Sequence, residues 1–123
     1  MTMLPYTLVI CAYLMGSFSA GILVSKFLSL PDPRTLGSKN PGATNVLRTG
    51  GKKAAILTLL GDSLKGLIPI LVARYFGLSF EWLAIIGIAA FLGHVFSLYY
   101  GFKGGKGVAT AMGIYLGLNP LIG

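Results

Sequence analysis

The sequence predicts an all-α protein, a polytopic bundle of about four transmembrane helices whose N-terminus lies outside the cell. Hydrophobic residues make up 54% of the 123 positions, and the mean hydropathy is +0.79. Charged residues make up only 11%, against about 25% in a typical soluble domain. The charges are also clustered, so that long stretches of the chain carry none. This combination is typical of a membrane protein that crosses the bilayer several times.

Four segments are candidates for the membrane spans, since a helix needs roughly 20 apolar residues to cross the hydrocarbon core. They are residues 1–25, 54–73, 82–102 and 107–123. The second segment is interrupted by Asp62 and Lys65, and the others carry no charge. The first segment has no Lys or Arg before its apolar run, which argues against a signal peptide. We therefore expect residues 1–123 to form a single membrane-integral domain.

The basic residues predict the topology. The loop at 26–53 carries six Lys or Arg, the loop at 103–106 carries two, and the loop at 74–81 carries only Arg74. If each segment crosses the membrane, the first and third loops lie on one side. The positive-inside rule makes that side cytoplasmic. Anionic lipid headgroups could account for part of this charge, whereas nucleic acid is not an expected partner because the chain has no soluble basic domain.

Few polar side chains lie within the apolar segments. Asp62 and Lys65 are three residues apart on one helical face, and we interpret them as a structural ion pair in the bundle. His94 is interpreted as a packed, hydrogen-bonded residue, and Cys11 as a small packed one. No cluster of His, Cys, Asp or Glu has metal-ligand spacing, so neither a metal nor a cofactor is expected.

The first loop contains the motif GSKNPGATNVLR, residues 37–48. Its candidate ligand residues are Ser38, Asn40, Thr44, Asn45 and Arg48. We expect a short helical turn that opens at Thr44 or Asn45 and places Arg48 on the same face. Hydroxyl, amide and guanidinium groups arranged in this way could bind a phosphate. The alternative is an ordinary polar loop with one interfacial Arg.

The third loop, GFKGGKGVAT at residues 101–110, is rich in glycine and lysine. It does not match the Walker A pattern, because Gly107 stands where Ser or Thr is required. Gly104, Gly105 and Gly107 would let backbone N–H groups converge on an anion, and Lys103 and Lys106 would add cations. A helix is expected to start at VAT, and its N-terminus favours negative charge. A tight turn between two helices is the alternative.

Taken in order, the motifs GSFSAGILVSK, GSKNPGATNVLRTGGKKAA, DSLKG, GH and FKGGKGVAT resemble those of the bacterial acyl-phosphate:glycerol-3-phosphate acyltransferase family, over roughly residues 16–110. The resemblance implies an integral enzyme of the inner membrane that makes phospholipid. It would transfer a fatty acyl group from acyl phosphate to the 1-hydroxyl of glycerol 3-phosphate, releasing lysophosphatidate and inorganic phosphate, with a substrate phosphate serving as base.

The resemblance also implies the roles of the site residues. Ser38, Arg48 and Lys106 would be the catalytic residues that hold glycerol 3-phosphate. The substrate-binding residues would be Asn40, Thr44, Asn45, Lys103, Gly104, Gly105 and Gly107, with Asn45 also supporting the first loop.

The sequence departs from the family pattern in three respects. Lys39 stands where the family usually has Gly, and Ser97 where it commonly has Pro, which we expect to alter a helix kink. The family is also nearly twice as long, and its last third carries a further His and Asn motif with no counterpart here. We therefore expect residues 1–123 to be the N-terminal part of a longer fold with little activity of its own. A membrane transporter subunit for a phosphorylated or organic anion is the alternative function.

Overall fold

The computed structural model describes residues 3–35, 37, 41–97 and 107–119, and all regular elements in this part of the chain are α-helices. In chain order they are α1 (Met3–Ser17), α2 (Ala20–Phe27), α3 (Ala43–Gly50), α4 (Lys52–Tyr75), α5 (Phe80–Val95) and α6 (Val108–Leu118). The predicted all-α class is confirmed.

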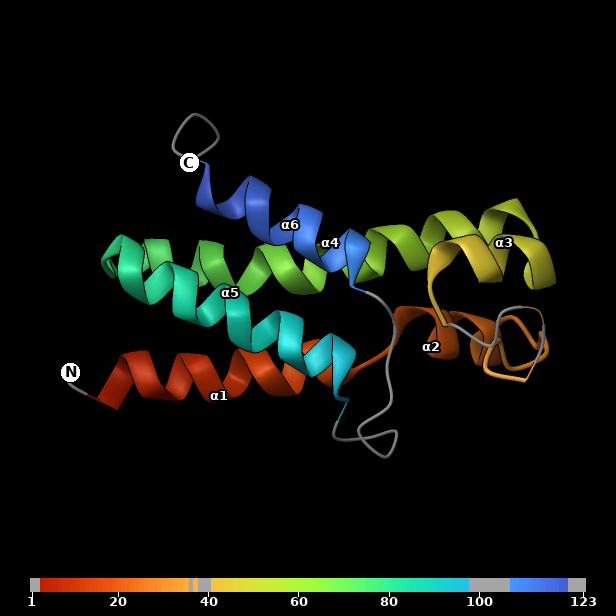
Figure 1. Ribbon diagram of the computed structural model, residues 1–123, viewed down its shortest axis with the longest axis horizontal. Helices are drawn as coiled ribbons and strands as arrows, with labels where there is room; N and C mark the ends of the chain where they lie inside the picture. Colours follow the sequence, from red (N-terminus) through yellow and green to blue (C-terminus); the bar gives the residue numbers. More distant parts are fainter. Residues whose placement is uncertain (1–2, 36, 38–40, 98–106, 120–123) are drawn as a thin grey trace.

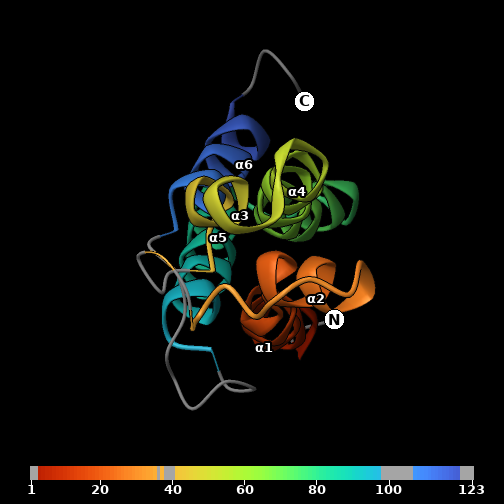
Figure 2. The same cartoon turned by 90° about the vertical axis from the view of Figure 1, so that its right-hand side faces the viewer.

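Helix α4 is the centre of the bundle and contacts every other helix. It runs the length of the molecule, with α1, α5 and α6 along one half and α2 and α3 along the other (Figure 1). The end-on view shows α3 beside α4, with α1 and α2 below them (Figure 2). The most extensive packing is between α1 and α5 and between α4 and α6. The loops therefore bring the starts of α3 and α6 to the same central helix.

From the sequence we expected one continuous helix in the first apolar segment, but the structure does not contain one. It is divided into α1 and α2, which meet at an angle of 48°. The break falls at Phe18 and Ser19, and the Ser19 hydroxyl caps α2 by accepting a hydrogen bond from the Ile22 amide at 3.2 Å. A serine that bonds the backbone in this way favours a helix start over a helix interior.

Side chains from other parts of the chain satisfy the backbone groups that this break exposes. Lys65 Nζ on α4 donates to the Phe18 carbonyl at 2.7 Å, and the Ala20 amide donates to Asp62 Oδ1 at 3.4 Å. The Ser97 hydroxyl donates to the Ser17 carbonyl. Backbone groups in the apolar part of a membrane have no water to bond, so each must find a protein partner.

Two sequence-based interpretations concern these same side chains. Asp62 and Lys65 do form an ion pair, with Lys65 Nζ 3.1 Å from Asp62 Oδ1 and both side chains at least 93% buried, as predicted. The expected effect of Ser97 on a helix kink is wrong, because α5 ends at Val95 and Ser97 lies beyond it. Ser97 instead ties the end of α5 to the end of α1.

The exterior of the described helices is unusually apolar for a soluble protein. Large apolar side chains cover the outside of α4, including Ile56, Leu60, Leu64 and Ile68, whereas Thr58 on the same helix is fully buried. Cys11 is also exposed, so the interpretation as a packed residue is wrong. Many large exposed apolar side chains, together with polar side chains buried inside the bundle, are what a bilayer solvent favours.

The lengths of the described helices support the membrane prediction in part. Helix α4 alone is long and apolar enough to span a bilayer, and α1 with α2 passes the same test if the bent pair counts as one span. Helices α5 and α6 are apolar but shorter. The count of about four spans stays a prediction.

Several glycines of the described helices bring helix backbones into direct contact. A methyl group at Gly113 of α6 would overlap the Ser63 carbonyl of α4. In the same way, one at Gly16 would meet the Ala90 carbonyl, and one at Gly93 would meet the Tyr13 carbonyl. Small residues allow this approach, which is how membrane helices gain packing energy.

We expect Gly113→Ala to destabilise the protein by about 1–3 kcal/mol, because the added methyl must separate two backbones. Thermal unfolding in detergent measures the effect. Ala111→Leu on the exposed face of the same helix adds more volume without this clash and serves as the control. An unfolding midpoint for Gly113→Ala equal to that of the wild type would contradict the packing described here.

The ion pair yields a second prediction. Lys65→Met leaves the Asp62 carboxylate buried without its cation, and should cost about 3–5 kcal/mol. The double variant Asp62→Leu/Lys65→Met should be less unstable than the sum of the two single variants, because it removes both charges together. Thermal unfolding of the three variants gives the coupling energy. Strict additivity would show that the two side chains do not interact.

Candidate functional site

A cavity of about 330 Å³ lies where four helices meet, at the small end of the roughly 300–1,000 Å³ typical of ligand sites. Asp62 of α4 and His94 of α5 line its inner wall. The start of α3 contributes one side and the start of α6 another. The lining residues are Gly42, Ala43, Thr44, Asn45, Arg48, Leu59, Asp62, His94, Gly107, Val108, Ala109 and Met112.

Three features of this cavity are suited to anions. Helices α3 and α6 both begin at a glycine, Gly42 and Gly107, and neither start has a side-chain cap. The N-terminal N–H groups and the helix dipole favour negative charge at each start. The Arg48 side chain, in the last turn of α3, adds a guanidinium that can bind two phosphate oxygens.

Gly107 is required at its position for a conformational reason. Its φ of 85° and ψ of 11° are left-handed, a region that residues with a Cβ rarely adopt. A methyl group there would also press against the Phe91 ring of α5. With this backbone conformation, Gly107 leads directly into α6 at the edge of the cavity. The helix expected after Gly107 is therefore confirmed.

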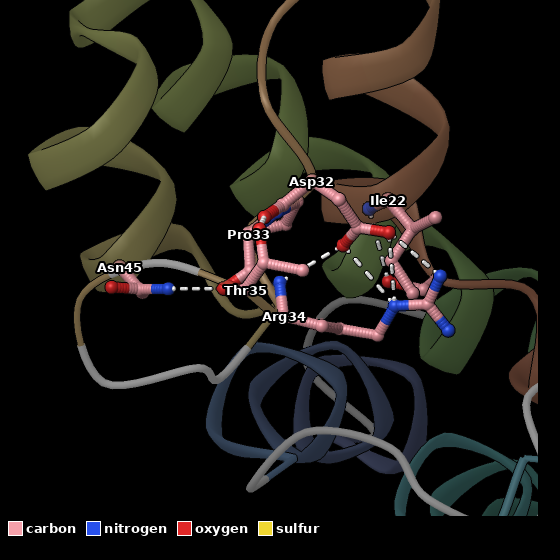
Figure 3. Close-up of polar contacts among 7 residues, drawn as sticks. Ile22, Asp32, Pro33, Arg34, Thr35 and Asn45 are labelled. Atoms are coloured by element: carbon pink, nitrogen blue, oxygen red, sulfur yellow. Dashed lines mark hydrogen bonds and ion pairs between the residues drawn. The ribbon is translucent and has the colours of Figure 1, made fainter.

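The start of the first loop is held in a compact turn (Figure 3). The Asp32 carboxylate accepts hydrogen bonds from the Arg34 amide at 2.9 Å and from the Arg34 guanidinium at 2.7 Å. The hydrogen bond from the Arg34 side chain lowers the pKa of Asp32. The Thr35 hydroxyl donates to the Asp32 carbonyl at 2.7 Å. These contacts give residues 32–35 a defined shape.

Asn45 ties this turn to α3. Its side-chain amide donates to the Pro33 carbonyl at 2.8 Å, and the residue is only 3% exposed. Figure 3 shows the Asn45 amide directed toward this part of the loop. The same residue lines the cavity, so one side chain joins the loop to the site.

The cavity brings together four of the residues predicted from the sequence: Thr44, Asn45, Arg48 and Gly107. Helix α3 opens at Ala43, one residue before the expected start, and Thr44 and Arg48 lie one turn apart. The other predicted site residues lie outside the described residues. They are Ser38, Asn40, Lys103, Gly104, Gly105 and Lys106.

Asp62 and His94 also line the cavity, although we expected only structural roles for them from the sequence. The interpretation of His94 as hydrogen-bonded is wrong within the described chain, where its buried Nδ1 has no partner. Both are ionisable residues within apolar segments, and such residues often mark a functional site. This property could have identified them as site candidates from the sequence. Among the described residues, no three His, Cys, Asp or Glu side chains are grouped as a metal site.

The fold and the cavity define a class: a helical protein with many large apolar side chains on its exterior and a partly polar cavity at the starts of two helices. The chain belongs to the glycerol-3-phosphate acyltransferase family, whose model matches residues 6–123. A relative from Thioalkalivibrio sulfidiphilus, named glycerol-3-phosphate acyltransferase, is 60% identical over 98% of this chain and 60% of its own length. One of the same name from Methylococcus capsulatus is 61% identical over 91% and 57%.

Two solved structures share the fold. The crystal structure of PlsY (YgiH), an integral membrane glycerol 3-phosphate acyltransferase, in its glycerol 3-phosphate form has a TM-score of 0.85 and 45% identity, over 95% of this chain and 58% of that one. The lysophosphatidic acid form has a TM-score of 0.83 and 44% identity over the same shares. The chain thus spans about three fifths of the length of these relatives. The comparisons do not support the anion-transporter alternative.

We expect Asn45→Ala to loosen the turn at residues 32–35, because it removes the hydrogen bond to Pro33 and leaves that carbonyl without its amide donor. The loss should be about 1–3 kcal/mol. Hydrogen exchange of the amides at 32–35 measures it. Leu47→Ala, on the exposed side of the same helix, is the control. Unchanged exchange in Asn45→Ala would contradict the anchoring role.

Proposed function

We propose that this chain carries the substrate-binding part of an enzyme that acylates glycerol 3-phosphate. The 1-hydroxyl oxygen attacks the carbonyl carbon of an acyl phosphate, and the bond from that carbon to the phosphate oxygen breaks. The hydroxyl proton passes to a substrate phosphate, and the products are lysophosphatidate and inorganic phosphate. Acyl phosphate is an activated anhydride, so positioning and charge stabilisation are the main tasks of the protein.

The observation that carries this proposal is the meeting of Arg48 with the starts of α3 and α6 at one cavity. Both substrates carry a phosphate, and the cavity offers two helix N-termini, each favourable to an anion. Arg48 is proposed as a catalytic residue, with Ser38 and Lys106. Thr44, Asn45 and Gly107 are proposed to bind substrate, as are Asn40, Lys103, Gly104 and Gly105.

The apolar side chains at the rim of the cavity favour an acyl donor as the second substrate. Leu59 of α4 and Met112 of α6 both line the cavity and are 45% and 57% exposed. They belong to the apolar outer surface, which would face lipid. An acyl chain could therefore lie along the hydrocarbon while its phosphate reaches the polar wall. We expect membrane lipid to surround the protein, and we propose no nucleic-acid partner.

We place the protein in the bacterial inner membrane as a multi-pass protein of about four spans, with the N-terminus outside. The basic loops at 26–53 and 103–106 support a cytoplasmic position for the site. Glycerol 3-phosphate is a charged, water-soluble substrate, so a site at the membrane face gives it access without crossing hydrocarbon.

The experiment is lysophosphatidate formation from palmitoyl phosphate and labelled glycerol 3-phosphate in detergent. It is run on the 123-residue chain, and on this chain fused to the C-terminal remainder of the Thioalkalivibrio sulfidiphilus relative. We expect turnover by the fusion and little by the chain alone. Arg48→Ala in the fusion should lower kcat/KM for glycerol 3-phosphate by about 10- to 150-fold, the value of a lost charged hydrogen bond.

Lys53→Ala is the matched control, because it removes an exposed basic side chain that does not line the cavity. It should leave kcat/KM unchanged. Equal losses in the two variants would assign the effect to the general charge of this face rather than to the cavity. A folded fusion without turnover would overturn the proposed function.

A further inference from the structure

An apolar groove between α2 and α4 lies away from the cavity described above. Its volume is about 520 Å³, and it shares no lining residue with that cavity. Its wall is almost entirely apolar, with Leu23 of α2 and Leu57 of α4 45% and 41% exposed. The lining residues are Leu23, Val24, Lys26, Phe27, Leu28 and Leu57.

A basic hollow of about 410 Å³ adjoins this groove, because Leu23 and Lys26 line both. Figure 3 shows Asp32 and Arg34, two further lining residues, near Ile22 of α2. Arg34 is paired with Asp32 at 2.7 Å, whereas the exposed Lys26 makes no ion pair within the described residues. Lys26 therefore supplies the net positive charge of the hollow. The lining residues are Ile22, Leu23, Lys26, Leu30, Asp32 and Arg34.

The groove and the hollow follow one another as the chain and the headgroup of a lipid do. On α2, Leu23 comes one turn before Lys26, so the helix becomes basic toward its end. On α4 the basic residues come first, and Leu57 follows them. The end of α2 and the start of α4 lie at the same end of the molecule (Figure 1). In the topology proposed above, the basic hollow lies at headgroup level and the groove in hydrocarbon.

The end of α2 is also compatible with a phosphate, although a helix C-terminus carries partial negative charge. The Ser25 carbonyl accepts a hydrogen bond from the Leu30 amide at 2.7 Å, and the Lys26 carbonyl accepts one from the Ser29 amide at 3.2 Å. These carbonyls are thus already bonded. The Lys26 ammonium, in the last turn of α2, offsets the charge of the helix end.

We propose that the groove and the basic hollow together bind an anionic phospholipid of the surrounding membrane. Its phosphate contacts Lys26, and one acyl chain lies in the groove against Leu23 and Leu57. Charge complementarity selects the headgroup, because a zwitterionic lipid brings an ammonium that Lys26 repels. This site goes beyond the proposed acyltransferase function and does not depend on it.

The test titrates the 123-residue chain, freed of lipid in detergent, with dioleoyl phosphatidylglycerol or dioleoyl phosphatidylcholine, which differ only in the headgroup. Native mass spectrometry gives the apparent Kd of the first bound lipid and the oligomeric state. We expect the wild type to prefer the anionic lipid by about fivefold, the effect of one basic residue near a membrane surface. Lys26→Gln should remove most of this preference. Lys52→Gln, which changes an exposed lysine that lines neither hollow, should keep it.

A second pair of variants tests the apolar groove. Leu57→Trp fills the groove, and should weaken the first binding of both lipids by about fivefold through lost apolar contact. Ile56→Trp is the matched control, because Ile56 is 57% exposed and does not line the groove. Circular dichroism checks that each variant is folded.

Equal losses of preference in Lys26→Gln and Lys52→Gln would assign the effect to the general charge of this face and overturn the site. So would equal effects of the two Trp variants, or a wild type without preference. A dimer that Leu57→Trp alone disrupts would assign the groove to a second copy of the chain instead. The acyltransferase proposal is tested separately, by turnover of the folded fusion.

Discussion

The buried ion pair between Asp62 and Lys65 is the interaction on which the rest of this structure depends. A helix that breaks inside an apolar environment exposes backbone groups that only protein can satisfy. Lys65 and Asp62 satisfy two of them, at Phe18 and Ala20. The Thr110 hydroxyl donates to the Asp62 carbonyl at 2.9 Å and brings α6 to the same point. One turn of α4 thus fixes α1, α2 and α6 together.

This junction lies directly beside the cavity, which explains why a costly buried pair is kept there. Asp62 belongs to both. Replacing a buried ion pair with apolar residues is often neutral for stability, so stability alone does not account for it. The pair instead holds the Asp62 carboxylate at a defined place beside the cavity.

Much of this could be predicted from the sequence, because the signals are local. Charge-free apolar stretches indicate helices in lipid, and the DSLKG spacing places Asp62 and Lys65 on one face of a helix. The helix after Gly107 follows from the glycine that precedes it. The family follows from motifs such as GSKNPGATNVLR, which are long and ordered. In each case the signal lies within one continuous stretch of the chain.

The remainder depends on contacts between distant segments. The break at Phe18 is fixed by Lys65, which lies 47 residues further along the chain. Asp62, His94, Arg48 and Gly107 come from four helices, and only their packing makes them one cavity. No local pattern distinguishes a packed His94 from one that lines a site, because the difference lies in what surrounds the imidazole. The sequence alone therefore determined the all-α class and the family. Tertiary packing decided which polar groups meet, because hydrogen bonds and charges act through space rather than along the chain.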